Sequence, residues 1–325
     1  MPAPLRIATL GVGRIVHRGL LPGIAGCDDA VLTVAASQRP GAAAELAAAT
    51  GADAVDGYEA ALRRDDVDAV YIPARGDEHG RWTLAAAAAG KHVLCEKPLA
   101  IDVAEAERMA AACRDAGVIL FEAFMWRHQP RTLAVRDMLR REEFGPLRSI
   151  HAAFGFRIDP DDWRLDPTQA GGALYDVGCY GINAARLFAG EEPSRVDADA
   201  RWSDSGVDLT TRVGLSFPSG VLATVACSFE TPLRNAITIA TDEAEIFVPN
   251  AFLPPENPTV VIRRDEQNDE TRTYPGTDQY AEQMAAFVAS VRSGTVVEPA
   301  EDGVANMRAL AAALASAKRS QGAGA

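Results

Sequence analysis

The chain has 325 residues, 48% of them hydrophobic and 24% charged, and a formal net charge of -13 at pH 7. This length exceeds what one hydrophobic core usually organises, so we expect two domains. The negative charge argues against nucleic acid or an anionic membrane as the main partner, because both attract basic patches. No apolar run approaches the roughly 18 residues of a membrane span, which argues against a transmembrane protein.

The cysteines and histidines are too scattered for a redox or metal-binding motif. The cysteines lie at positions 27, 95, 113, 179 and 227 and form no C-x-x-C pair. The histidines show no H-E-x-x-H spacing, so we expect neither a disulfide framework nor a bound metal. The first apolar segment begins almost at once and leaves no room for a signal peptide, so the predicted location is the cytoplasm.

Residues 5 to 122 alternate short apolar segments with amphipathic or alanine-rich ones. The expected strands are LRIATL, VLTVAAS, VDAVYI, KHVLC and VILFEA. Asp102 and Glu105 form a capping box at the start of one expected helix. The alternation predicts a doubly wound parallel sheet, and we assign a dinucleotide-binding domain to residues 1–122.

From about residue 194, strand-like segments follow one another without helices between them. They are SRVDADARWS, DLTTRVGLSF, VLATVACSF, NAITIATD, AEIFVP and TVVIRR. Such a succession predicts a second α/β domain, residues 123–325, with a large, open and mostly antiparallel sheet. Two helices close the chain, near residues 279–292 and about 300–318, and the last is a candidate to pack back on the first domain.

The segment ATLGVGRIV places Gly11 and Gly13 between the first expected strand and the first expected helix. Glycine there permits a tight turn and a close approach of the backbone to a pyrophosphate. The third small residue of G-x-G-x-x-G is missing, since Val16 stands in its place. The position of the motif in a βαβ run predicts a dinucleotide site, with an ordinary strand-to-helix turn as the alternative.

Ser37 and Arg39 follow the second expected strand, where an NAD-selective site usually offers a carboxylate to the ribose. A carboxylate would repel a 2′-phosphate, whereas a hydroxyl and a guanidinium can bind one. We therefore predict NADP(H) as the favoured cofactor and NAD(H) as the alternative. The preference would be absent if Arg39 only began the next helix in solvent.

Only three of the 32 basic residues are lysines, and Lys97 stands between Glu96 and Pro98 at the end of an expected strand. A lysine can release its proton when its pKa is lowered, whereas an arginine cannot. Lowering its pKa from about 10.4 to roughly 8 weakens the charged form by about 3 kcal/mol. Chance placement is the alternative, since Lys91 and Lys318 have no evident role. We predict that Lys97 transfers a proton, and that a cis bond before Pro98 aims it inward.

The segment GGALYDVGCYGINAARLF predicts a helix from Gly172 to Phe188. Asp176 and Tyr180 are four residues apart and would share one face of it. An acid and a phenol that point the same way suit hydride transfer, in which the reacting oxygen gains or loses a proton. The structural alternative is that Tyr180 packs its ring and Asp176 serves as a charge at the helix end.

Four segments, GVGRI, CEKPLA, EAFMWRHQP and GGALYDVGCYGIN, occur in this order and resemble the Gfo/Idh/MocA family of oxidoreductases over essentially the whole chain. The resemblance implies a Rossmann domain and an α/β domain whose open sheet commonly mediates oligomers, here a homodimer or homotetramer. It also implies a nicotinamide cofactor, with Lys97, Asp176 and Tyr180 around the substrate. With tyrosine at position 180 and the segment EAFMWRHQP, the chain resembles the branch that contains glucose-fructose oxidoreductases, aldose dehydrogenases, dihydrodiol dehydrogenases and 3-ketosugar reductases. This resemblance implies a sugar or cyclic polyol as substrate.

The same motifs supply the other predicted site residues. The predicted cofactor-binding residues are Gly11, Gly13, Arg14, Ile15, Ser37, Arg39, Pro73, His79 and Glu96. The residues predicted to line the substrate site from the second domain are Arg127, Trp163 and Arg164, with a structural ion pair and a surface loop as their alternatives. Arg75 departs from the Pro-Asn pair that relatives often have in the loop bordering the cofactor.

The predicted function is hydride transfer between NADP(H) and a hydroxyl or carbonyl carbon of a sugar, sugar derivative or cyclic polyol. Lys97 would donate or accept the proton, assisted by Asp176 and Tyr180. One rival is a non-catalytic sensor of dinucleotide or sugar on the same fold, which retention of these three residues opposes. The other is an NAD-dependent glycosidase, which Tyr180 opposes together with Ser37 and Arg39.

Overall fold

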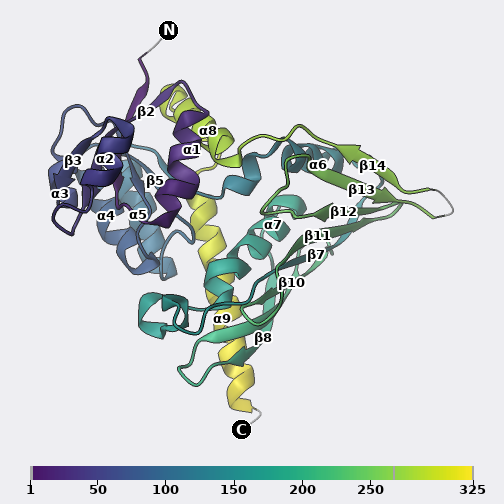
Figure 1. Cartoon of the computed structure of the whole chain (residues 1–325). Coiled ribbons are helices and arrows are strands. Elements are labelled where there is room, and N and C mark those ends of the chain that lie inside the picture. Colours follow the sequence, from purple (N-terminus) through teal and green to yellow (C-terminus); the bar gives the residue numbers. More distant parts are fainter. Residues whose placement is uncertain (1–2, 266–267, 324–325) are drawn as a thin grey trace. The chain divides into compact units, whose positions relative to one another are not determined.

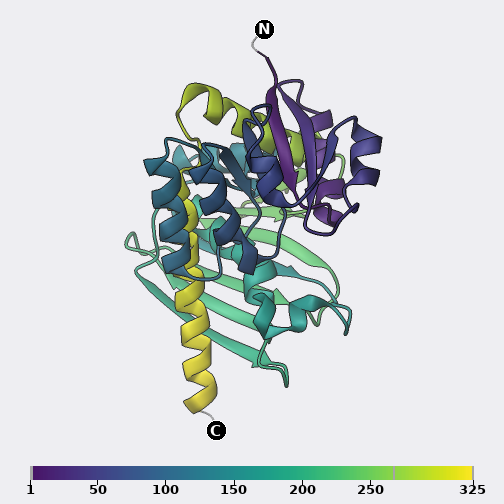
Figure 2. The ribbon, with the colours of Figure 1, turned by 90° about the vertical axis from the view of Figure 1, so that its left-hand side faces the viewer.

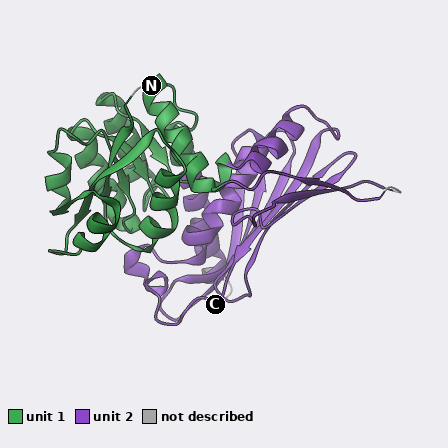
Figure 3. Ribbon diagram, turned by 45° about the horizontal axis from the view of Figure 1, so that its top comes forward, with its two compact units in different colours: residues 1–128, 278–304 green, residues 129–277, 305–325 purple. Residues whose placement is uncertain are grey.

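A computed structural model describes residues 3–265 and 268–323 of the chain, which divides into two units (Figure 3). Unit 1 comprises residues 1–128 and 278–304, and unit 2 comprises residues 129–277 and 305–325. This division differs from the single boundary expected after residue 122, because the chain returns to unit 1 near its end. Within the described ranges, none of the helices is long and apolar enough to cross a membrane.

Unit 1 contains a six-stranded parallel sheet in the order β3-β2-β1-β4-β5-β6, the order of a Rossmann fold. Figure 1 labels β2, β3 and β5 of this sheet. The strands are β1 Leu5–Leu10, β2 Ala30–Ser37, β3 Asp53–Asp56, β4 Ala69–Ile72, β5 His92–Cys95 and β6 Leu120–Glu122. The helices are α1 Leu21–Ala25, preceded by a π-helical turn Val16–Leu20, and α2 Ala44–Thr50, α3 Tyr58–Leu62, α4 Gly76–Ala88, α5 Val103–Asp115 and α8 Gln279–Ser293, with a 3-10 turn at Met125–His128. The edge strand β3 was not predicted, because most of its residues are exposed and no apolar run marks it.

Helix α8 completes the core of unit 1. Its residues Met284, Phe287 and Val288 belong to one buried cluster with Ile7 of β1 and Phe121 of β6. The rings of Phe121 and Phe287 meet edge to face with centroids 5.8 Å apart. Burying a large apolar side chain contributes about 1.5–3 kcal/mol, which accounts for the return of the chain to this unit. The last helix was expected to return to this unit. Only its first turn, up to residue 304, belongs to unit 1.

Unit 2 contains an eight-stranded sheet in the order β14-β13-β12-β11-β7-β10-β9-β8. The strands are β7 Leu147–Gly155, β8 Arg195–Trp202, β9 Asp208–Ser216, β10 Leu222–Ser228, β11 Arg234–Thr241, β12 Glu245–Pro249, β13 Thr259–Arg263 and β14 Glu270–Thr273. Figure 2 shows these strands, teal to green, running side by side. All neighbours are antiparallel except β7 and β10, which pair in parallel, so the predicted mostly antiparallel sheet is confirmed. The oligomer predicted through this sheet stays a prediction.

The helical segments of unit 2 differ from expectation in the segment that carries Asp176 and Tyr180. They are α6 Pro130–Arg140, the 3-10 turns Trp163–Leu165 and Pro167–Gln169, a π-helical turn Leu174–Gly178, α7 Cys179–Ala189 and most of α9 Ala300–Ala323. One regular helix was expected from Gly172 to Phe188. The structure instead begins with the π-helical turn, which carries Asp176, and continues as α7, which carries Tyr180. Single π-helical turns often occur at functional sites, because they change the direction of side chains along a helix.

Candidate functional site

The predicted site residues fall on both units. In unit 1, the glycine turn after β1 borders a pocket of about 370 Å³. The pocket is lined by Gly11, Val12, Gly13, Ser37, Gln38, Arg39, Tyr58, Pro73, Ala74, Arg75 and Glu78. Gly11 has φ of 140°, and a Cβ atom there would lie 3.0 Å from Cγ of Pro73. Only glycine therefore lets the turns after β1 and β4 come this close.

Ser37 and Arg39 line this pocket at the carboxyl end of β2. The Ser37 side chain is buried, and its Oγ accepts a hydrogen bond from the backbone N–H of Arg39 at 3.1 Å. Arg39 is exposed, and residue 38 between the two is a glutamine. The turn after β2 thus offers a hydroxyl and a guanidinium without a carboxylate, a combination suited to a phosphate group.

Four predicted cofactor residues are not among those that line the pocket: Arg14, Ile15, His79 and Glu96. Six residues that line it were not predicted to bind the cofactor: Val12, Gln38, Tyr58, Ala74, Arg75 and Glu78. The guanidinium of Arg75 pairs with Asp77 at 2.9 Å. No sequence pattern identifies Tyr58 or Glu78, because their place in the pocket depends on how the starts of α3 and α4 approach β2.

Lys97 follows β5, and the Lys97–Pro98 bond is cis, as predicted. His79 holds this segment from α4. Its Nδ1 lies 3.0 Å from the carbonyl oxygen of Pro98, and its Nε2 lies 2.9 Å from that of Ala74. Burial lowers the pKa of His79, although both carbonyl groups act in the opposite direction, so the neutral ring donates to one of them. His79 was predicted to bind the cofactor. In the structure its side chain is buried, with 1% exposure, and it connects the turn after β4 to the segment that carries Lys97.

Two carboxylates fix the backbone around Lys97. Glu122, buried at the end of β6, accepts a hydrogen bond from the backbone N–H of Leu99 at 2.8 Å. Glu96 accepts the phenol O–H of Tyr71 at 2.6 Å. Burial and the charge of Glu96 raise the pKa of Tyr71 well above its usual value, so the phenol keeps its proton. Lys97 is half-buried on a backbone that buried groups position.

In unit 2, Asp176 forms an ion pair with one of the predicted substrate residues. Nε of Arg164 lies 2.9 Å from Oδ2 of Asp176, and the two side chains are 23% and 16% exposed. The guanidinium also lies over the ring of Trp163, 4.7 Å from its centroid. Burial lowers the pKa of Arg164, but the carboxylates of Asp176 and Asp162 outweigh this and raise it. The structure therefore brings Trp163, Arg164 and Asp176 together in one cluster.

A buried carboxylate anchors the turn that carries Asp176. Oδ2 of Asp208 accepts hydrogen bonds from the backbone N–H of Leu174 at 2.7 Å and from the hydroxyl of Thr211 at 2.8 Å. Gly172 has φ of 122°, and a Cβ atom there would lie 2.2 Å from Oδ1 of Asp208. Burial raises the pKa of Asp208, while the two hydrogen bonds lower it. Glycine at position 172 is thus required by both backbone conformation and space.

The ring of Tyr180 is only 5% exposed. It meets the ring of Phe154 edge to face and that of Phe252 at a tilt, each with centroids 5.3 Å apart. The ring therefore packs in the core of unit 2, as the structural alternative expected, and its role toward a substrate stays a prediction.

Arg127 was predicted to line the site from the second domain, but it belongs to unit 1. Its Nε lies 2.6 Å from Oε1 of Glu298, and both side chains are 10% exposed. A second carboxylate, that of Asp302, pairs with the same guanidinium. This buried network has the geometry of a structural ion pair, the alternative that the sequence left open, because a paired and buried guanidinium has little freedom to meet a substrate.

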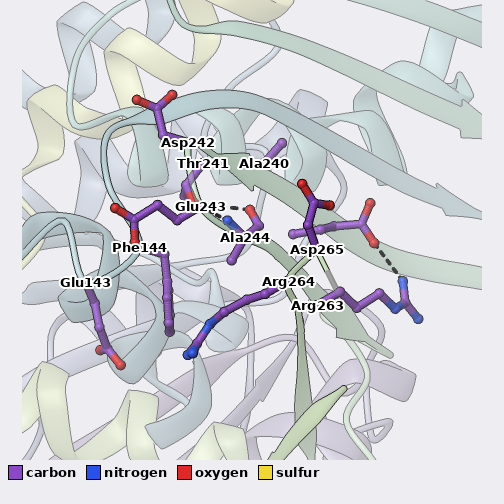
Figure 4. A pocket seen from close by; sticks show the side chains of 11 residues that line it. Glu143, Phe144, Ala240, Thr241, Asp242, Glu243, Ala244, Arg263, Arg264 and Asp265 are labelled. Atoms are coloured by element: carbon purple, nitrogen blue, oxygen red, sulfur yellow. Dashed lines mark hydrogen bonds and ion pairs between the residues drawn. The ribbon is translucent and has the colours of Figure 1, made fainter. Parts of the chain in front are cut away.

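A larger hollow of about 800 Å³ lies in unit 2 (Figure 4). It is lined by Glu143, Phe144, Ala240, Thr241, Asp242, Glu243, Ala244, Glu245, Arg263, Arg264 and Asp265. Arg263, labelled in Figure 4, pairs with Glu245 at 2.6 Å. None of the predicted site residues lines it. In the part of the chain that the structure describes, no group of three or more His, Cys, Asp or Glu side chains could hold a metal ion.

Comparison with known proteins defines the class. Residues 5–124 match the model of an oxidoreductase family with an NAD-binding Rossmann fold, and residues 132–247 match the GFO/IDH/MocA C-terminal domain. The chain belongs to the Gfo/Idh/MocA family of oxidoreductases. The predicted family, the two-domain α/β fold, the enzyme class and the nicotinamide dinucleotide cofactor are thereby confirmed.

Three similar proteins illustrate the family. D-xylose 1-dehydrogenase (NADP(+)) 2 of Haloferax volcanii is 36% identical over 319 residues, covering 95% of this chain and 96% of that protein. The dTDP-3,4-didehydro-2,6-dideoxy-alpha-D-glucose 3-reductase of Actinomadura kijaniata is 36% identical over 295 residues, covering 90% and 89%. The crystal structure of KijD10, a 3-ketoreductase from Actinomadura kijaniata in complex with NADP and TDP-benzene, matches with a TM-score of 0.90 at 34% identity, covering 96% and 98%.

Proposed function

We propose that the protein transfers a hydride between NADP(H) and a hydroxyl or carbonyl carbon of a sugar, a sugar derivative or a related cyclic polyol. The observation that carries the cofactor preference is the turn after β2, where Ser37 and Arg39 border the pocket and no carboxylate intervenes. The substrate class is supported by the similar proteins, whose names refer to xylose and to a dTDP-sugar.

The residues of the chain fit a nicotinamide dinucleotide. The glycine turn at Gly11 and Gly13 would hold the pyrophosphate. Gly11 is too crowded for a side chain, which keeps the turn tight, and no atom lies within 4 Å of a Cβ at Gly13, which leaves space for the ligand beside the backbone. Ser37 and Arg39 would hold the 2′-phosphate. The bound cofactor supplies or accepts the hydride.

Three side chains would handle the proton and the substrate. Lys97 would give a proton to the reacting oxygen in reduction, or remove one in oxidation. Asp176 would accept a hydrogen bond from a substrate hydroxyl or from the Lys97 ammonium, and Tyr180 would hydrogen-bond the reacting oxygen. The fixed backbone around Lys97 supports this assignment, because acid–base catalysis requires a proton donor within hydrogen-bond reach of the oxygen.

A substrate screen tests the proposal. The protein is incubated with aldoses, ketosugars and trans-dihydrodiols, each with NADP(H) and with NAD(H), and the absorbance of the reduced nicotinamide is followed. We expect turnover with at least one sugar or polyol and a preference for NADP(H). Binding of dinucleotide or sugar without turnover would favour the sensor, and glycoside cleavage with tightly bound NAD would favour the glycosidase.

The cofactor preference has a sharper test in Arg39→Ala. Loss of a guanidinium from a phosphate site should weaken NADPH binding by about 10- to 100-fold and leave NADH binding little changed. Arg63→Ala, which removes an exposed guanidinium at the end of α3, serves as the control. The dissociation constants are measured from the fluorescence of the reduced nicotinamide. Equal losses for the two cofactors would contradict the assignment of Arg39 to the 2′-phosphate.

A further inference from the structure

Given the proposed function, on which this inference rests, the pocket in unit 1 receives the adenosine half of the cofactor. In the sheet order, β2 lies on one side of β1, whereas β4 and then β5 lie on the other. Lys97 follows β5, so a cofactor whose nicotinamide reacts beside Lys97 would place its opposite end near the end of β2. The volume of about 370 Å³ suits a nucleoside with its phosphate rather than a whole dinucleotide.

One carboxylate, that of Glu78, lines this pocket from the first turn of α4. Its Oε2 accepts a hydrogen bond from Nε1 of Trp82 at 2.8 Å. Trp82 is only 1% exposed, and its ring meets that of Tyr58 edge to face with centroids 4.8 Å apart. The carboxylate is therefore held by a buried partner, and it cannot turn into solvent without losing that hydrogen bond.

A fixed negative charge opposes a polyanionic ligand unless it accepts a hydrogen bond from it. At the adenosine end of NADP(H) the 2′-hydroxyl is esterified, which leaves the 3′-hydroxyl and the 6-amino group of adenine as donors. Ser37 and Arg39 border the pocket after β2, whereas Glu78 borders it from the helix after β4. With the 2′-phosphate at the first position, the base is the part of the ligand that extends toward Glu78.

We propose that Glu78 accepts a hydrogen bond from the 6-amino group of adenine and thereby selects adenine dinucleotides over those with another purine. Hypoxanthine carries an oxygen in place of this amino group and would set two acceptors against each other. A site built to hydrogen-bond one group rejects an analogue without it, here by about 10- to 100-fold in affinity.

The test compares NADPH with its deamino analogue, the reduced nicotinamide hypoxanthine dinucleotide phosphate. Dissociation constants for the full chain are measured from the fluorescence of the reduced nicotinamide, which is the same in both ligands. We expect the unaltered protein to bind NADPH about 10- to 100-fold more tightly. In Glu78→Gln the preference should nearly vanish, because an amide can accept from the amino group and can also donate to the oxo group.

The control is Glu59→Gln, which removes an exposed carboxylate from α3 and should keep the preference of the unaltered protein. Equal affinities of the unaltered protein for the two ligands would overturn the inference even if Glu78→Gln failed to fold. An unchanged preference in Glu78→Gln would overturn it as well. If both ligands bound more tightly by the same factor, the preference would also be unchanged, and charge repulsion alone would explain the effect of Glu78. Absence of any NADPH binding would instead overturn the proposed cofactor, and the inference with it.

Discussion

The segments that carry Lys97 and Asp176 are each held by a buried carboxylate that accepts a backbone N–H, Glu122 in unit 1 and Asp208 in unit 2, but they differ in their other partners. In unit 1 the backbone that follows Lys97 is hydrogen-bonded by two buried side chains of other elements, His79 and Glu122. In unit 2 the carboxylate of Asp176 also pairs with the partly exposed Arg164.

This difference matches the two proposed tasks. A lysine that transfers a proton must have an accurately placed backbone, and buried hydrogen bonds to the peptide groups beside it provide that placement. A carboxylate that orients a substrate hydroxyl must be held in position and must still be able to accept a further hydrogen bond, which a guanidinium beside it permits. The comparison therefore separates side chains that fix the position of the backbone from a side chain that acts on the charge of the functional group.

Lys97→Ala should have the largest effect. Loss of the proton donor should lower kcat for the best substrate of the screen by about 10²–10⁴-fold, while NADPH binding stays nearly unchanged. Lys318→Ala, at an exposed position on α9, is the control. A kcat within a few-fold of the unaltered enzyme would remove Lys97 from the mechanism and end the comparison.

Gly172→Ala tests how the turn of Asp176 is anchored. A Cβ atom would lie 2.2 Å from Oδ1 of Asp208 on a backbone with φ of 122°, so the free energy of unfolding should fall by about 2–4 kcal/mol. Gly206→Ala is the matched control, because φ is 87° there and no atom lies within 4 Å of the new Cβ. It should cost about 1 kcal/mol, from conformation alone. Denaturant unfolding measures both, and equal losses would show that contact with Asp208 does not constrain this turn.

Arg164→Gln tests the charge beside Asp176. The pair is partly exposed, so its loss should lower kcat/KM by about tenfold without weakening NADPH binding. Arg157→Gln, which removes an exposed guanidinium that follows β7, should behave like the unaltered enzyme. An equal loss of NADPH affinity would show that Arg164 acts outside the substrate part of the site.

His79 should produce the smallest effect, a pH dependence of stability. Burial holds its folded-state pKa below the ordinary value of about 6.5, so the unfolded chain binds a proton first as the pH falls. The contribution of neutral His79 is present above that value and is lost as the pH falls toward the folded-state pKa. Unfolding free energies of the unaltered protein and of His79→Gln should therefore converge on acidification. A constant difference between them would mean that His79 does not titrate between the two states.

Much of the fold could be predicted because apolar segments and turn residues mark it. The segment of β5 lies where the sequence indicated. The Asp102 side chain caps α5 by accepting the backbone N–H of Glu105 at 2.7 Å, whereas the Glu105 carboxylate accepts the backbone N–H of Ile101 at 3.2 Å, so only half of the predicted capping box forms. The edge strand β3 was missed, since exposed residues leave no hydrophobic pattern. The π-helical turn at Asp176 was also missed, because its sequence periodicity resembles that of a regular helix.

The site was predicted in part for a similar reason. Gly11, Ser37 and Arg39, which the sequence assigns to the cofactor, line the pocket because they follow strands whose ends define it. Glu78 lines the pocket too but was not predicted to do so, because the pattern of a helix start does not tell which of its side chains faces a neighbouring turn. Arg127 was assigned to the second domain but belongs to unit 1. The sequence pattern does not show this, because its carboxylate partner Asp302 lies 175 residues later in the chain.

The return of the chain to unit 1 has a consequence for biosynthesis. The N-terminal sheet leaves the ribosome long before α8 is translated, so the cluster around Ile7 and Phe121 is at first without Phe287. A nascent chain with such uncovered apolar surface is a target for chaperones and a source of aggregation. A polypeptide that stopped before residue 278 would lack parts of both units, so premature termination would yield neither unit in finished form.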